Sequence, residues 1–220
     1  MTKKILLFIS MFFMALPAFA AVDKSAVKFL SAEEISAHKS TIKWVEEYLS
    51  RITTITSDFT QSAPDGSLSS GKFYLSRPNK MRWEYKPPTP ILMVANGSQL
   101  VYYDSELEQV SYIPIGSTLI GFLAQEKIKF NDNNSKNAVG ITSFSEDAGM
   151  VKIGVAQREK PSDGNIVLEF SDSPLALRKM LVTDASGQVT DVALSNAKFG
   201  DEIDKKLFEF EDPRDKRKGR

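Results

Sequence analysis

The sequence of 220 residues contains no cysteine and only one histidine, His38. Without cysteine it cannot form disulfides, thiolate metal sites or a cysteine nucleophile, and it offers no thiol for a lipid anchor. A single histidine likewise excludes a zinc site built from several histidines. His38 lies in a polar stretch near the N-terminus, and we expect it to be a solvated surface residue rather than a catalytic base.

The charges are balanced, with 28 Lys and Arg against 28 Asp and Glu, so the chain lacks the basic excess that favours nucleic-acid binding. Hydrophobic residues make up 42% and charged residues 25%, which is typical of a globular protein rather than a disordered chain or one with many membrane spans. The sequence also lacks a G-x-S-x-G elbow, an H-E-x-x-H motif and a glycine-rich phosphate loop. We therefore predict a protein that is not an enzyme, binds no nucleic acid and uses no cofactor or metal.

Long hydrophobic runs are missing as well, since the longest, Ile5–Leu16, spans twelve residues. Crossing a bilayer core of about 30 Å takes about 20 apolar residues, so this run is too short for an uncleaved anchor. It follows two lysines and precedes Ala18-Phe19-Ala20, which fits the A-x-A pattern of a signal-peptide cleavage site. We predict that residues 1–20 are a cleaved secretory signal and that Ala21 begins the mature chain.

Helical periodicity appears first from Ser40 onward. Ile42, Val45 and Leu49 fall on one stripe of a helix, with Ser40 or Thr41 as its N-terminal cap. The spacing predicts one amphipathic helix that packs its apolar stripe on the rest of the fold.

From Asp58 onward the hydrophobic pattern has a period close to two. In the segment 81–86, Met-Arg-Trp-Glu-Tyr-Lys, large apolar residues alternate with charged ones, as in a strand with one buried face. Shorter alternations occur at Phe73/Leu75, Val110/Tyr112, Val151/Ile153/Val155, Ile166/Leu168/Phe170, Thr190/Val192/Leu194 and Phe208/Phe210. Asn-Gly and Asp-Gly pairs between such segments are typical of hairpin turns. The pattern predicts a single, mainly β domain with a few helices, whose antiparallel meander curls into a barrel, a half-barrel or a sandwich.

The segment from Pro114 to Ala124 interrupts the strand pattern. Ser117 can cap a helix there, and four large apolar residues follow it, namely Leu119, Ile120, Phe122 and Leu123. The spacing predicts a short helix that is apolar on most of its surface. Such a helix is either a plug in the core at one end of the sheet, which periodicity alone favours, or a lid over an apolar cavity.

Arg77 is a charged residue that the strand pattern places on an apolar face. Period two puts it on the face of Phe73 and Leu75. A buried guanidinium needs carbonyls, a carboxylate or water as partners, because burying it unpaired is very unfavourable. Alternatively, the strand ends at Arg77, before Pro78, and the side chain lies at a hydrated rim.

Several short segments form a pattern beyond periodicity. The most specific is the Arg-Pro-Asn-x-x-x-Trp stretch from Arg77 to Trp83, and Phe59-Thr60-Gln61 precedes it. Weaker matches are Asn96-Gly97, the tyrosine-containing segment 100–104, Glu108-Gln109-Val110 and the segment 208–213. Together, from Trp44 to Pro213, these segments resemble the LolA family of periplasmic outer-membrane lipoprotein carriers.

The resemblance implies an unclosed, strongly curved antiparallel β half-barrel with a helical lid, formed by residues 21–213. Its concave face would hold the acyl chains of lipoproteins, whereas a dry, closed core is the alternative. The candidate lipid-binding residues are Phe73, Leu75, Met81, Trp83 and Tyr85, and the candidate lid residues are Leu119, Ile120, Phe122 and Leu123. Arg77 would hold the lid, Ser117–Ala124, shut by hydrogen bonds to its backbone.

The resemblance also implies a location and partners. The protein would be a periplasmic monomer that receives acylated lipoproteins from an inner-membrane ABC-type lipoprotein-releasing complex. It would pass them to an outer-membrane lipoprotein receptor or to the outer membrane itself. We expect residues 214–220 to be a solvated basic tail, with contact to anionic lipid headgroups as the alternative.

Two other functions remain open at this point. A related half-barrel could bind free lipid or sense lipoproteins in the periplasm. A small periplasmic enzyme could use the same curved sheet, but it would need a polar cleft with titratable groups of perturbed pKa.

Overall fold

The computed structural model describes residues 27–132 and 138–214, so the predicted signal peptide and the basic tail beyond Arg214 lie outside the described residues. About half of the described residues form one antiparallel sheet. Its strands are β1 (Thr54–Ser62), β2 (Leu68–Ser76), β3 (Lys80–Tyr85), β4 (Ile91–Asn96), β5 (Gln99–Asp104), β6 (Gln109–Pro114), β7 (Val139–Asp147), β8 (Met150–Gln157), β9 (Gly164–Asp172), β10 (Leu175–Asp184) and β11 (Val189–Phe199).

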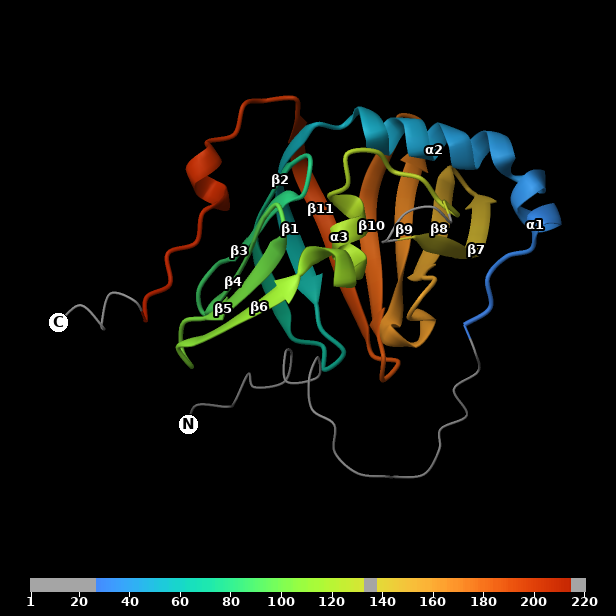
Figure 1. Ribbon diagram of the computed structural model, residues 1–220. Coiled ribbons are helices and arrows are strands. Elements are labelled where there is room, and N and C mark those ends of the chain that lie inside the picture. Colours follow the sequence, from blue (N-terminus) through green and yellow to red (C-terminus); the bar gives the residue numbers. More distant parts are fainter. Residues whose placement is uncertain (1–26, 133–137, 215–220) are drawn as a thin grey trace, which may run out of the picture.

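The sheet has the order β6-β5-β4-β3-β2-β1-β11-β10-β9-β8-β7, so the first and last strands of the chain pair at its centre. Strands β6 and β7 are the two edges and are not paired with each other in the described sheet. Figure 1 shows the sheet bent into two facing halves, β1–β6 in teal to yellow-green and β7–β11 in yellow to orange. The predicted unclosed, mainly β antiparallel half-barrel is therefore confirmed.

Irregularities in the strand pairing accompany the curvature. The register shifts between Thr56 and Asp58 where β1 pairs with β11, and similar shifts occur between β9 and β10 and between β7 and β8. A bulge of this kind bends its strand and increases the local twist. At the first of them the buried Ser57 hydroxyl donates to the Ser195 carbonyl oxygen at 2.7 Å.

The predicted amphipathic helix is α2 (Lys39–Arg51), which buries Ile42, Val45 and Leu49 and lies along one end of the sheet (Figure 1). Its start differs from the prediction, because the helix begins at Lys39 and neither Ser40 nor Thr41 caps it. A further helix that the sequence did not reveal, α1 (Ala32–Ala37), precedes it and begins with a capping box between Ser31 and Glu34.

His38 lies between these two helices and is half-buried. Its ring stacks on that of Phe144 in the edge strand β7, with centroids 4.1 Å apart. The expectation of a freely solvated histidine was therefore wrong in part, because the N-terminal helices pack against the sheet edge.

After β6 the chain forms a short 3-10 turn, η2 (Ile115–Ser117), and the helix α3 (Leu119–Leu123). Thr118, rather than the predicted Ser117, caps α3, since its side chain accepts a hydrogen bond from the Gly121 backbone N–H. Gly121 allows α3 to pack closely on η2, because a Cβ at this position would meet the Ile115 carbonyl oxygen at 2.1 Å.

The end of the described chain is not the strand that Phe208 and Phe210 suggested. Phe208 is the last residue of a 3-10 turn, η4 (Lys205–Phe208), which packs on β3 and β4, and its side chain is buried. Arg82 on β3 donates to the Leu207 carbonyl oxygen at 3.2 Å, which fastens this segment to the sheet. A second 3-10 turn, η3 (Pro161–Asp163), precedes β9. Among the described residues, none of the helices has the length and apolar character needed to cross a membrane.

Candidate functional site

The alternation in β2 and β3 places four large apolar side chains on one buried face. Phe73 lies opposite Trp83, and Leu75 lies opposite Met81 in the antiparallel register. Met81 is fully buried and Trp83 is only 3% exposed. The rings of Phe73 and Trp83 are 4.2 Å apart, so the cross-strand pairs pack as one unit.

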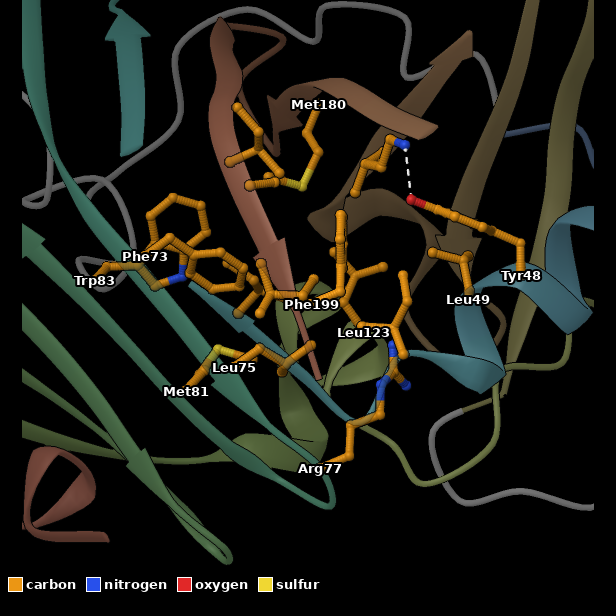
Figure 2. Close-up of a pocket in the computed structure, with 16 residues that line it drawn as sticks. Tyr48, Leu49, Phe73, Leu75, Arg77, Met81, Trp83, Leu123, Met180 and Phe199 are labelled. Carbon is orange, nitrogen blue, oxygen red and sulfur yellow. Dashed lines mark hydrogen bonds between the residues drawn. The ribbon is translucent and has the colours of Figure 1, made fainter. Parts of the chain in front are cut away.

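This face forms one wall of a cavity between the sheet and α3, shown in Figure 2. The described residues that line it are Tyr48, Leu49, Ile52, Ile55, Phe73, Leu75, Arg77, Met81, Trp83, Ile120, Leu123, Leu177, Met180, Leu194, Ala197 and Phe199. Arg77 alone among them carries a charge. The cavity volume is about 30 Å³, which is roughly the space of one water molecule. In this conformation this cavity is therefore nearly filled by side chains.

The helix α3 contributes to the closure of the cavity through two of the four predicted residues. Ile120 and Leu123 line the cavity. Phe122 is buried and packs on Phe130, with ring centroids 5.7 Å apart, and Leu119 packs on the core without lining the cavity. The four α3 residues thus divide between lining this cavity and packing on the core.

Arg77 follows directly after the last residue of β2, so the alternative that the strand ends there is partly correct. Its side chain nevertheless lines the cavity, and its Nη1 donates a hydrogen bond to the Gln125 carbonyl oxygen. This acceptor lies one residue beyond the predicted lid segment. The neighbouring Asn79 backbone N–H donates to the Ala124 carbonyl oxygen at 2.7 Å, so two bonds fix the C-terminal end of α3.

Burial lowers the pKa of the Arg77 guanidinium to about 10. It therefore stays protonated at neutral pH and keeps its hydrogen-bond donors. Its Nε is buried and has no hydrogen-bond partner. Among the described residues, the Gln125 carbonyl oxygen is thus the hydrogen-bond acceptor found for this side chain.

The segment after α3 is anchored to α2. The Ile128 backbone N–H donates to Ser50 Oγ at 3.0 Å, and the Phe130 N–H donates to the Glu46 carboxylate at 2.6 Å. Burial raises the pKa of Glu46, and the hydrogen bond from Phe130 opposes that rise only in part. The stretch that could move without disturbing α2 therefore ends before Ile128.

Tyr85, the fifth predicted lipid-binding residue, lies in a second and larger cavity of about 290 Å³. Trp83, Ile120 and Met180 line both cavities, so the two share a wall. The Tyr85 hydroxyl donates to Gln61 Oε1 at 2.7 Å, and burial raises the pKa of Tyr85 well above its ordinary value. The predicted set is thus spread over two adjoining cavities rather than one.

Sequence reasoning missed the opposite wall of the first cavity. Tyr48 from α2 contributes to it, and its hydroxyl oxygen accepts a hydrogen bond from the Leu177 backbone N–H at 3.2 Å. Leu177 and Met180 of β10 and Leu194 and Phe199 of β11 complete it. The alternation in β11 was visible in the sequence, but nothing local showed that this face meets β2 and β3.

No group of three or more His, Cys, Asp or Glu side chains in the described parts of the chain is placed to hold a metal ion. What the fold and the site define is an open antiparallel half-barrel whose concave face is apolar and is covered by short helices.

Residues 50–211 match the family model of the outer membrane lipoprotein carrier protein LolA. An outer-membrane lipoprotein carrier protein of Methylococcus capsulatus is 29% identical over 77% of this chain and 82% of its own length. A protein of the same name from Legionella pneumophila is 32% identical over 77% of this chain and 85% of its own. The chain belongs to the LolA family.

Proposed function

We propose that this protein is a periplasmic carrier that binds the acyl chains of lipoproteins released from the inner membrane and carries them to the outer membrane. Its membership of the LolA family and the names of its relatives support this role. The structural observation that carries it is the apolar concave face, closed by α3, with a single charged side chain, Arg77, fastened to the end of that helix.

The physical need for such a carrier follows from the cargo. Each exposed methylene group costs about 0.8 kcal/mol in water, so an acyl chain cannot cross the periplasm unshielded. A cavity of about 30 Å³ cannot hold such a chain. The first cavity, between the sheet and α3, can therefore be loaded only if α3 moves. The present conformation corresponds to the closed, unloaded form.

Arg77 acts as the gate in this proposal. Its bond to Gln125 and the bond from Asn79 to Ala124 exist only while α3 is closed. Acyl chains that enter the first cavity break these bonds, and the bonds form again when the chains leave. Closure thus opposes loading and favours delivery, so the affinity stays low enough for the cargo to be released.

We infer the handling steps from the family. The carrier receives lipoproteins from an inner-membrane ABC-type releasing complex and transfers them to an outer-membrane receptor or to the outer membrane. It works as a monomer, without metal or cofactor. The mature chain reaches the periplasm through the signal peptide predicted at residues 1–20.

Reconstituted transfer tests this function. Inner-membrane vesicles that contain a labelled triacylated lipoprotein and the releasing complex are incubated with the purified protein, and the label is then followed into outer-membrane vesicles. We expect transfer that depends on the protein and on ATP. Release of phospholipid without lipoprotein would instead support the alternative of a free-lipid-binding half-barrel.

A further inference from the structure

We propose that the edge strand β6 binds the polypeptide of the cargo, by pairing with the extended segment that follows the acylated cysteine of a lipoprotein. The inference rests on the proposed function and deepens it, since it concerns the peptide of the cargo and not its acyl chains. Such pairing adds one strand to the sheet and recognises the peptide mainly through its backbone.

The outer side of β6 carries backbone hydrogen-bonding groups that point away from the sheet. The Ile115 N–H donates to the Ser98 carbonyl oxygen at 3.0 Å, which fixes the alternation of the β5–β6 ladder. The N–H and C=O groups of Val110 and Tyr112 consequently point away from β5. Among the described residues, no other segment forms hydrogen bonds with these groups.

The other edge of the sheet, β7, is covered. The Leu30 N–H donates to the Ile141 carbonyl oxygen at 2.8 Å, and the Ile141 N–H donates to Asn131 Oδ1 at 3.0 Å. Further along β7 the His38 ring stacks on Phe144. Within the described parts of the chain, β6 is therefore the edge that remains open for pairing.

The sequence of β6 lacks the usual protection of an edge strand. Exposed edges normally carry charged side chains, prolines or bulges that prevent another chain from pairing with them. The segment Gln109–Pro114 has no charged residue, its proline is the last position, and it pairs with β5 without a register shift. Val110 and Tyr112 are residue types that favour strands, and Tyr112 is 47% exposed. The strand is thus suited to accept a further strand.

The position of β6 favours the cargo peptide as that strand. Ser111 and Ile113 lie opposite Tyr102 and Leu100 on the concave side of the sheet. From β6 the chain continues through η2 into α3, which closes the first cavity (Figure 1). A peptide attached to acyl chains in that cavity is therefore held near the edge at a high effective concentration. Backbone pairing also accommodates lipoproteins of different sequence.

Amide hydrogen exchange, followed by NMR, tests the pairing directly. The probe is a synthetic triacylated cysteine extended by a short neutral peptide, and the triacylated cysteine amide without the peptide is the reference ligand. We expect the lipopeptide to slow exchange of the Val110 and Tyr112 amides at least about tenfold, whereas the reference ligand should not. The amides of Ser111 and Ile113, which bond to β5, should change little.

Backbone methylation of the peptide provides a matched control. N-methyl groups on alternate residues block one edge of an extended strand and leave its side chains unchanged. Two lipopeptides methylated in opposite phases should therefore differ. One should lose the affinity gained over the reference ligand, about two- to tenfold for each hydrogen bond, and the other should keep it.

A proline in β6 is the corresponding variant of the protein. Val110→Pro removes an N–H that does not bond to β5, so it should weaken the lipopeptide about two- to tenfold and leave the reference ligand unchanged. Val189→Pro is the same substitution at an exposed position in the other half of the sheet. The hydrogen bond from the Asp184 N–H to the Gln188 carbonyl oxygen shows that the Val189 N–H does not pair with β10, so this control should change neither ligand. If Val110→Pro fails to fold by circular dichroism, the methylated lipopeptides still decide.

Equal affinity of the two methylated lipopeptides, or unchanged exchange at Val110 and Tyr112 in the complex, would overturn the inference. Protection of these amides that grows with protein concentration, or that is lost when residues 215–220 are removed, would also overturn it, because a second copy or the tail would then occupy β6. Failure of the reference ligand to bind would count against the proposed function and with it this inference. Binding of that ligand without any gain from the peptide would overturn only this inference.

Discussion

Arg77 makes one of the two hydrogen bonds that fix the C-terminal end of α3. A hydrogen bond to a charged group contributes about 1.5–3 kcal/mol, so losing it should shift the closed-to-open equilibrium by about ten- to a hundredfold. We predict that Arg77→Leu binds a fluorescent acyl probe at least as well as the wild type but transfers lipoprotein more slowly. Arg77→Lys should be intermediate, because one ammonium does not reproduce the planar guanidinium. An Arg77→Leu variant with unchanged binding and transfer would show that Arg77 is only a rim residue.

Glu46 gives a prediction about pH. Burial raises its pKa above the ordinary 4.5, so the folded state holds this proton to higher pH than the unfolded state does. The contribution of Glu46 to stability therefore falls as the pH rises through that window. Because Glu46→Gln retains an acceptor for the Phe130 N–H but has no charge to bury, we expect its stability relative to wild type to improve between pH 4 and pH 7.

Urea midpoints at the two pH values measure this difference. Glu47→Gln is the control, since Glu47 is exposed and pairs with Lys43 and Arg51 on the helix surface, at 3.7 and 3.9 Å. A gain for Glu46→Gln that shrinks with rising pH would mean that the charged carboxylate is the favoured form.

For single residues, the sequence predicted burial correctly where apolar and polar side chains alternate strictly along a strand. Met81 and Trp83 lie on the buried face that alternation assigned to them, with Phe73 and Leu75 opposite. The carbonyl that accepts the hydrogen bond from Arg77 belongs to Gln125, one residue beyond the predicted segment, because apolar spacing does not locate the end of the helix. Residues of the far wall, such as Tyr48 and Met180, were missed because their proximity depends on how the sheet bends.

Among the elements, α3 is the one whose stability bears on the proposed mechanism. It has only five residues, and the Thr118 hydroxyl both donates to the Ile115 carbonyl at 2.8 Å and accepts from the Gly121 N–H at 3.1 Å. Replacing such a cap by alanine costs about 1 kcal/mol. We predict that Thr118→Ala accelerates hydrogen exchange in the segment 115–125 several-fold without changing exchange in the strands, as followed by mass spectrometry.

The neighbouring hydroxyl provides the control for this prediction. Ser117 is exposed and donates only to the Pro114 carbonyl at 2.8 Å, so Ser117→Ala should change exchange little. If Ser117→Ala had the larger effect, the cap predicted from the sequence would be the functional one after all.

The elements themselves differed in how well the sequence predicted them. Strands with alternating apolar residues and the amphipathic α2 were predictable, because burial of one face imposes the period. The helix α1 was not, since none of its residues is buried and its signal is only the Ser31 capping box. The two-residue spacing of Phe208 and Phe210 wrongly predicted a strand. A 3-10 turn that buries one aromatic side chain, as η4 buries Phe208, can be followed by a second aromatic residue at the spacing typical of a strand.

For the whole molecule, composition and hairpin signals left a barrel, a half-barrel and a sandwich open. The pairing of β1 with β11 and the open edges β6 and β7 decide for the half-barrel, and these depend on contacts between distant parts of the chain. The division of the interior into a nearly filled cavity and a larger one likewise depends on packing. The hydrophobic periodicity of the sequence does not predict the volume of either cavity.

The central claim is that the protein carries acylated lipoproteins, and its bound ligand tests this most directly. The protein is purified from the periplasm of its own cells without detergent and studied by native mass spectrometry followed by lipid analysis. We predict that a fraction of it carries a triacylated lipoprotein in a one-to-one complex, and that Arg77→Leu increases this fraction. Protein that carries only phospholipid, or no acylated ligand in either form, would contradict the account.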